Sequence, residues 1–116
     1  MAQSVAKIAE PGPPAIDRSH LARMTFGDRS LEREVLQLFD RQACLLLARM
    51  RSGEPQAVAT LAHTLRGSAT GIGADNVARM AAAVEQSDPA QREAAMETLA
   101  AAIVEARAAI AELLRD

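Results

Sequence analysis

The sequence predicts an all-α protein: an up-down antiparallel four-helix bundle with a short additional N-terminal helix. Hydrophobic residues make up 49% of the 116-residue chain but aromatic residues only 2%, so the core must consist of aliphatic side chains and alanine. Alanine and leucine lead the scale of helix propensity, whereas the residues that favour strands are sparse here. Apolar residues also recur at three- and four-residue steps between breaks rich in glycine and proline. A chain of this length is expected to form one domain.

The chain divides into a tail and a domain. Residues 1–15 contain the run Glu10-Pro11-Gly12-Pro13-Pro14, which cannot continue a helix. We therefore predict that residues 1–15 form a flexible N-terminal tail and that residues 16–116 form the bundle.

A short helix and a long helix are predicted at the start of the bundle. Asp17 or Ser19 caps the short helix, which ends at Gly27-Asp28, and the long helix begins at Asp28 or Ser30 and runs to about Arg51. The side chains of the short helix expected to point inward are Ile16, Leu21 and Met24. The long helix has an apolar stripe that is expected to face the core, formed by Leu31, Val35, Leu38, Gln42, Leu45 and Arg49 and widened by Phe39 and Leu46.

Three further helices are predicted, joined by short corners. The first runs from about Pro55 to Thr70 and is broken by Gly71-Ile72-Gly73, and the next begins near Asp75. After the corner Ser87-Asp88-Pro89, the last helix spans about residues 90–115. Its apolar positions keep a three-four alternation: Met96, Leu99, Ile103, Ala106, Ile110 and Leu113. Because the corners are short, neighbouring helices are expected to be antiparallel.

His63 is predicted to point away from the core of this bundle. On a helical wheel, the buried stripe of its helix comprises Val58, Leu61, Ala62, Leu65, Ala69 and Ile72. His63 lies roughly 160° from the centre of that stripe, which makes it an exposed residue. A lone histidine is more often structural or incidental, and we interpret His20, which sits in the short first helix, in that way.

The neighbours of His63 indicate a functional role. Gly67 lies one turn ahead and Ala59 one turn behind, so the imidazole stands above a low surface, although glycine costs ~1 kcal/mol against alanine within a helix. Arg66 shares that side and could place a guanidinium beside a phosphoryl group. Ser68 and Thr70 could donate hydrogen bonds nearby. Each feature alone also has an ordinary structural explanation. Gly67 could simply permit close helix packing, and Arg66 could simply be a solvated surface charge.

The segment from Ala62 to Ala69, Ala-His-Thr-Leu-Arg-Gly-Ser-Ala, followed by Gly71-Ile72-Gly73-Ala74, resembles the signature of histidine-containing phosphotransfer (HPt) domains. That signature is usually written A-H-x-L-K-G-S, then a short spacer and L-G-A. The resemblance extends over the chain apart from its first fifteen residues. Arg66 stands where the family usually has lysine, which keeps the charge but changes the donor geometry. Glu85 falls where some members have a glutamine near the histidine, and we assign it no role from the sequence.

The resemblance implies that His63 accepts a phosphoryl group from a receiver-domain aspartate and passes it to another receiver domain. His63 would be the phosphoacceptor through Nε2, and Arg66 and Ser68 would stabilise the phosphoryl group. The surface that docks the partner is expected to include Ala59, Thr60, Gly67 and Thr70. The expected partners are receiver domains of response regulators and of hybrid histidine kinases. The chain would thus be a carrier and not an enzyme, with no cofactor of its own, because Mg²⁺ is expected only in the partner receiver domain.

Composition argues against several other classes of protein. The formal net charge is −2, with 13 basic and 15 acidic residues and no basic stripe, so a nucleic-acid partner is not expected. Cys44 is the only cysteine, which excludes an intrachain disulfide and a multi-cysteine zinc site. No signal peptide or membrane span is evident, and we expect a cytoplasmic monomer without membrane contact.

Three alternatives remain open at this point. The main one is a non-catalytic helical adaptor that binds a kinase or receiver domain without phosphorylation, against which the complete motif from His63 to Gly67 argues. The phosphoacceptor part of a histidine kinase also exposes a helical histidine. In that class an acidic residue, an arginine and a proline usually follow the histidine, and this pattern is absent after His63. A metal-binding bundle is disfavoured because the two histidines lie on separate helices.

Overall fold

The computed structural model describes residues 14–115. Of the predicted tail, only Pro14 and Ala15 fall within this range, so the prediction that residues 1–15 form a tail concerns mainly positions outside the described residues. Between residues 14 and 115 every regular element is a helix, and the prediction of an all-α protein is confirmed. The helices are α2 (Arg18–Met24), α3 (Arg29–Ser52), α4 (Pro55–Ile72), α5 (Asp75–Gln86) and α6 (Pro89–Arg115).

The helix boundaries agree with the capping signals in the sequence. The Asp17 side chain caps α2 by accepting a hydrogen bond from the His20 backbone N–H, and Asp28 caps α3 through the N–H of Leu31. Pro55 occupies the first turn of α4, where its missing N–H costs nothing. Helix α4 continues two residues beyond the predicted Thr70, to Ile72, and ends at Gly73.

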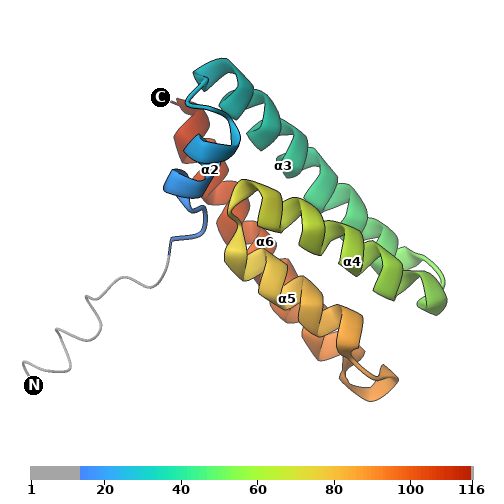
Figure 1. The fold of residues 1–116 in the computed structure, drawn as a ribbon. Coiled ribbons are helices and arrows are strands. Elements are labelled where there is room, and N and C mark those ends of the chain that lie inside the picture. The colour runs from blue at the N-terminus through green and yellow to red at the C-terminus, as the bar shows by residue number, and fades with distance from the viewer. Residues whose placement is uncertain (1–13, 116) are drawn as a thin grey trace, which may run out of the picture.

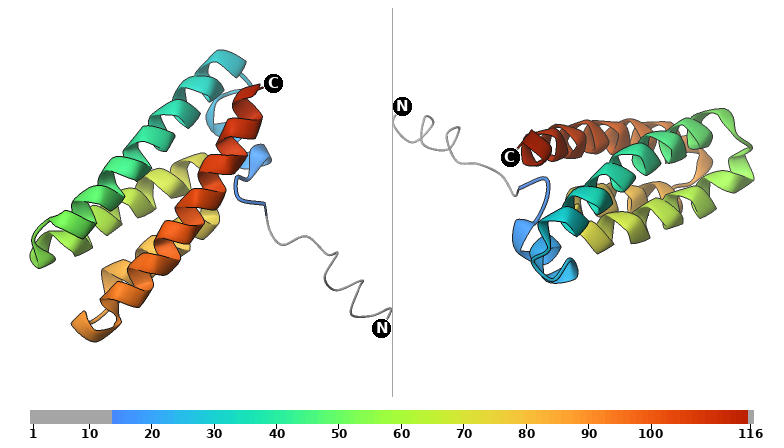
Figure 2. Two further views of the ribbon diagram at one scale, coloured as in Figure 1. Left: turned by 180° about the vertical axis from the view of Figure 1, so that it is seen from behind. Right: turned by 90° about the horizontal axis from the view of Figure 1, so that it is seen from above.

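The four long helices pack into one helical bundle (Figure 1). Helix α4 contacts α3 and α5, and α6 contacts α5 and α3. Views from behind and from above show the four helices side by side, with α2 at the end where α4 meets α5 (Figure 2). An ion pair also ties α6 to α3, because Arg107 Nε donates to Asp40 Oδ1 at 2.8 Å. This hydrogen bond and the Asp40 charge raise the pKa of Arg107.

The core is aliphatic, as the composition requires, with Phe39 as its aromatic member. The predicted seam of α6 is confirmed from Met96 to Ile110, and Leu113 is half-buried. The predicted inward orientation of Met24 is wrong, since that side chain is 52% exposed at the end of α2, whereas Ile16 and Leu21 are buried.

The predicted core stripe of α3 is also partly wrong. Leu38 and Leu45 are 57% and 51% exposed, and Arg49 is exposed too. The buried stripe is Leu36, Phe39, Ala43, Leu46 and Met50. Leu38 and Leu45 each precede a member of this stripe by one residue, which turns them ~100° away from it. Helix α3 therefore has a second apolar row, which contains the exposed Leu38 and Leu45, besides the row that faces the core.

Gly73 fixes the corner between α4 and α5. Its φ is +81°, in the left-handed region, and a Cβ there would lie 2.9 Å from the backbone oxygen of Asp17. The Gly73 carbonyl accepts a hydrogen bond from the Asp17 N–H at 2.8 Å, so this close approach attaches the segment before α2 to the end of α4.

Substitution of Gly73 by alanine (G73A) is therefore expected to lower the free energy of unfolding by about 1–3 kcal/mol, through left-handed strain and the contact with Asp17. The matched control is Gly71→Ala. Gly71 lies within helix α4, and a Cβ added there would meet no heavy atom within 4 Å. That control should leave stability unchanged or raise it by up to about 1 kcal/mol. Urea unfolding followed by circular dichroism measures both, and equal stabilities for the two variants would contradict this account of the corner.

Candidate functional site

Helix α4 presents His63 to solvent, as the sequence predicts. The neighbouring Ala62 and the following Leu65 are fully buried, whereas the His63 side chain is 61% exposed. Its Nε2 atom has no hydrogen-bond partner among residues 14–115, and the contacts of the ring all involve Nδ1. One ring nitrogen is thus anchored and the other is left available.

Glu85 on α5 provides the anchor. Its Oε2 lies 3.0 Å from His63 Nδ1, and its side chain is only 26% exposed. Arg66, one turn after His63 on α4, has its Nη1 3.4 Å from Glu85 Oε1 and its Nη2 3.3 Å from His63 Nδ1. The three side chains form a cluster that joins α4 to α5, in which one carboxylate contacts both an imidazole and a guanidinium.

Gly67 leaves the surface beside His63 open. A Cβ on Gly67 would meet no heavy atom within 4 Å, so the fold itself does not require glycine here. The energetic cost of glycine in the middle of a helix is therefore not explained by packing within the domain.

The other residues of the predicted docking surface lie on α4 around His63. Thr60 and Thr70 are exposed and Ala59 is half-buried. The Thr70 hydroxyl donates to the carbonyl of Arg66 at 2.9 Å within the helix. These positions leave a low surface on the turns before and after the histidine.

Ser68 is not brought to the site. It lies five residues after His63, which places it ~140° round the helix from the imidazole. It is half-buried and makes no hydrogen bond with His63 or Arg66. This position does not favour the expectation that Ser68 stabilises a phosphoryl group on His63, which stays a prediction, because five residues do not complete a whole number of helical turns.

Sequence reasoning placed Glu85 near His63 but gave it no role. The available signal was the register between α4 and α5, since a side chain one residue from the end of α5 can reach the middle of α4 only if the corner at Gly73 is tight. That register depends on tertiary contacts of Gly73 and Asp17, which helical periodicity does not contain.

His20 is separate from this cluster. Its Nε2 lies 3.1 Å from the carbonyl oxygen of Gly71, a contact that joins α2 to the last turn of α4. This hydrogen bond gives His20 a structural contact and agrees with its interpretation as a residue without a chemical role.

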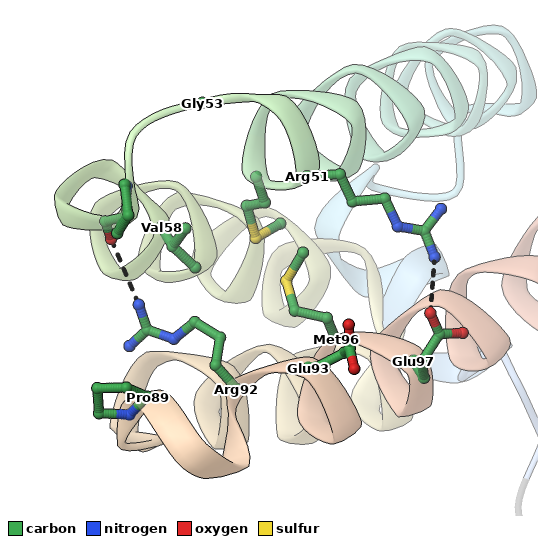
Figure 3. A pocket seen from close by; sticks show the side chains of 10 residues that line it. Arg51, Gly53, Val58, Pro89, Arg92, Glu93, Met96 and Glu97 are labelled. Carbon is green, nitrogen blue, oxygen red and sulfur yellow. Dashed lines mark hydrogen bonds and ion pairs between the residues drawn. The ribbon is translucent and has the colours of Figure 1, made fainter.

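A cavity of about 540 Å³ lies where the α3–α4 and α5–α6 connections meet (Figure 3). Met50, Val58 and Met96 contribute its apolar part. Its arginines are paired within the protein: Arg92 donates to the carbonyl of Pro55 and Arg51 pairs with Glu97. The residues that line the cavity do not include His63, Arg66 or Glu85, so the cavity and the histidine cluster are separate features.

A family model described as Hpt domain matches residues 30–114. The chain belongs to the Hpt domain family. The match covers α4 and α5, and with them His63, Arg66, Gly67 and Glu85. No curated protein and no solved structure matches the Hpt domain described here.

Two further findings concern the described part of this Hpt domain. Within residues 14–115 no helix has both the length and the apolar character of a membrane span. The same residues contain no group of three or more His, Cys, Asp and Glu side chains that could hold a metal ion. Membership of the family gives the chain a phosphotransfer-type role in two-component signalling, in which Hpt domains interact with receiver domains.

Proposed function

We propose that this domain is a phosphoryl carrier, in which Nε2 of His63 accepts a phosphoryl group from the aspartate of one receiver domain and passes it to a second receiver domain. The observation that supports this most strongly is the exposed imidazole with Nδ1 held by Glu85 and Nε2 without a partner among the described residues. A neutral imidazole is a competent nucleophile at pH 7 without further activation. The domain acts as a monomer and has no resident cofactor.

Arg66 supplies positive charge for the transferred group. Its guanidinium contacts the ring and is 39% exposed, so it can reach a phosphoryl group on His63 by side-chain rotation alone. Positioning and charge stabilisation supply most of the catalysis in phosphoryl transfer. The Mg²⁺ that such a reaction uses would be held by the acidic site of the partner receiver, where the aspartate lies.

An exposed face of α3, formed by two leucines and two arginines, extends the docking surface beyond α4. Leu38, Arg41, Leu45 and Arg49 are spaced three, four and four residues apart, so they share one face, and all are exposed. Its leucines, Leu38 and Leu45, lie ~160° and ~140° round the helix from Asp40, which contacts α6, and they therefore point away from α6. Two leucines in contact with the partner and two arginines beside them suit a partner whose surface is apolar with acidic groups around it.

The experiment that tests this function is a transfer assay with a panel of labelled phospho-receiver domains. We expect label to move to the wild-type protein as an adduct that is labile in acid and stable in alkali. Such stability distinguishes a phosphoramidate on histidine from a phosphate ester on serine or threonine. If no receiver in a broad panel labels the protein, the non-catalytic adaptor becomes the better function, and binding of the same unphosphorylated receivers would then identify its partner.

A further inference from the structure

The connection between α2 and α3 combines two unfavourable features at one residue, Phe26. Within residues 14–115 it is the only residue other than glycine with a positive φ, which is +56°. A bulky side chain is strained in this left-handed region, whereas glycine adopts it freely. The Phe26 side chain is also 90% exposed, so it gains almost nothing from packing within the domain. The stability of the free domain would therefore favour glycine at this position.

Hydrogen bonds hold the backbone on both sides of Phe26. The Gly27 N–H donates to the Ala22 carbonyl at 2.9 Å, and the Asp28 N–H donates to the Thr25 carbonyl at 2.9 Å. The Thr25 side chain is buried beneath this corner. The exposed ring is therefore held at the surface by a defined backbone conformation.

The corner also carries a second exposed apolar side chain. Met24, two residues before Phe26, is 52% exposed. A single exposed apolar residue is ordinary, but a strained and almost fully exposed aromatic beside a second apolar side chain is typical of a contact surface.

This corner lies on the side of the bundle that presents His63. Seen from above, α6 lies along one side of the bundle, and α4 and the connection between α2 and α3 lie along the other (Figure 2). His20 of α2 contacts the carbonyl of Gly71, eight residues after His63, which is ~12 Å along the helix. A specific interface of about 800 Å² per partner corresponds to a disc about 16 Å in radius. A receiver domain centred on His63 therefore reaches α2 and the corner that follows it.

We propose that Phe26 is a specificity-determining residue, whose ring contacts the receiver domain at the edge of the interface and selects among receivers. This inference rests on the proposed function. Every receiver must bring its aspartate to His63, so contacts around the histidine are common to all partners. Contacts at the corner between α2 and α3 are not constrained by the transfer and can differ from one receiver to another. The receiver surface that fits the ring is an apolar recess, in which an aromatic anchor contributes strongly to binding.

The selective role is tested by measuring kcat and KM for transfer from a panel of phospho-receivers to the wild type, F26A, F26W and V104A. Val104 is 67% exposed on α6, so V104A trims an exposed apolar side chain from a different helix. F26A should raise KM about tenfold for the receiver that the wild type prefers and less than about twofold for the poorest receivers, which reduces the discrimination. The kcat should stay unchanged, because the ring takes no part in the transfer. F26W should keep the order of receivers, and V104A should match the wild type.

The outcomes separate this role from the proposed function. Phosphoramidate, a small donor that needs no protein partner, should label F26A and the wild type at rates within about twofold of each other. A KM for F26A that is unchanged, or raised equally for every receiver, overturns the selective role while the carrier function stands. A change in the oligomeric state of F26A with an unchanged KM would assign the ring to a second copy of the chain and overturns it too. A wild type labelled by neither phosphoramidate nor any phospho-receiver overturns the proposed function, and the inference with it.

The variant F26G tests whether the ring is retained for the partner and not for the fold. Glycine removes both the ring and the backbone strain, whereas alanine removes only the ring. We expect the urea midpoint of F26G to lie above those of the wild type and F26A, together with the same reduced discrimination among receivers as F26A. A midpoint of F26G at or below that of the wild type would show that the ring stabilises the free domain, and it would overturn the inference.

Discussion

Replacing His63 with glutamine (H63Q) is expected to abolish labelling by phospho-receiver domains. Glutamine is similar in polarity and reach, but its amide has no nucleophilic lone pair at the position of Nε2. Because the His63 side chain is 61% exposed, the free energy of unfolding should change by no more than about 0.5 kcal/mol. Labelling of the variant is measured beside circular dichroism, which establishes that the unlabelled protein is folded.

The matched control for H63Q is the same substitution at His20. His20 contacts the Gly71 carbonyl through Nε2, and a glutamine amide can still donate a hydrogen bond there. H20Q should be labelled like the wild type. Labelling of H63Q at the wild-type level would place the phosphoryl group elsewhere and remove the basis of the site assignment.

Substitution of Gly67 by glutamine (G67Q) is expected to slow transfer from a phospho-receiver by about 100-fold, the usual consequence of displacing reacting groups by an ångström. The new side chain has room in the free domain, where a Cβ at Gly67 meets nothing within 4 Å, but it would stand between His63 and a docked partner. Replacing a helical glycine should at the same time raise the free energy of unfolding by about 0.5–1 kcal/mol. Slower transfer in a more stable protein would show that glycine is retained for the partner and not for the fold.

Two measurements separate docking from chemistry in G67Q. Labelling by phosphoramidate requires no protein partner and should stay within about threefold of the wild type, because the cluster of His63, Arg66 and Glu85 is intact and only exposed surface has changed. G67A should lie between the wild type and G67Q in its rate of transfer from the receiver. Unimpaired transfer to G67Q would mean that the partner approaches His63 from another direction.

The sequence predicts the fold class and the position of His63 well because both depend on local information. Capping by Asp17 and Asp28, the proline at the start of α4 and the glycine at its end are properties of single helices. The outward orientation of His63 follows from helical periodicity relative to the strongly apolar stripe on α4. The histidine motif that carries the family resemblance, Ala62 to Ala69, consists of contiguous residues of the same helix.

The features that the sequence did not predict depend on how the helices are arranged. Helix α3 has two apolar rows, and periodicity cannot tell which of them meets α4 and α6, so Leu38 and Leu45 were placed in the core and are in fact exposed. The contact from Glu85 to His63 spans two helices and depends on the tight corner at Gly73. Ser68 was drawn into the site by its closeness in sequence, although its position on the helix turns it away from the imidazole.

The most direct test of the carrier function is to identify the atom that becomes phosphorylated. Protein with ¹⁵N-labelled histidine is phosphorylated by a receiver domain, and the coupling of phosphorus to the ring nitrogens is recorded by NMR under alkaline conditions that preserve the adduct. The account predicts one new phosphorus–nitrogen bond, to Nε2 of His63, with Nδ1 still oriented toward Glu85. Phosphorus on Nδ1 of His63, on His20 or on an oxygen atom would contradict it.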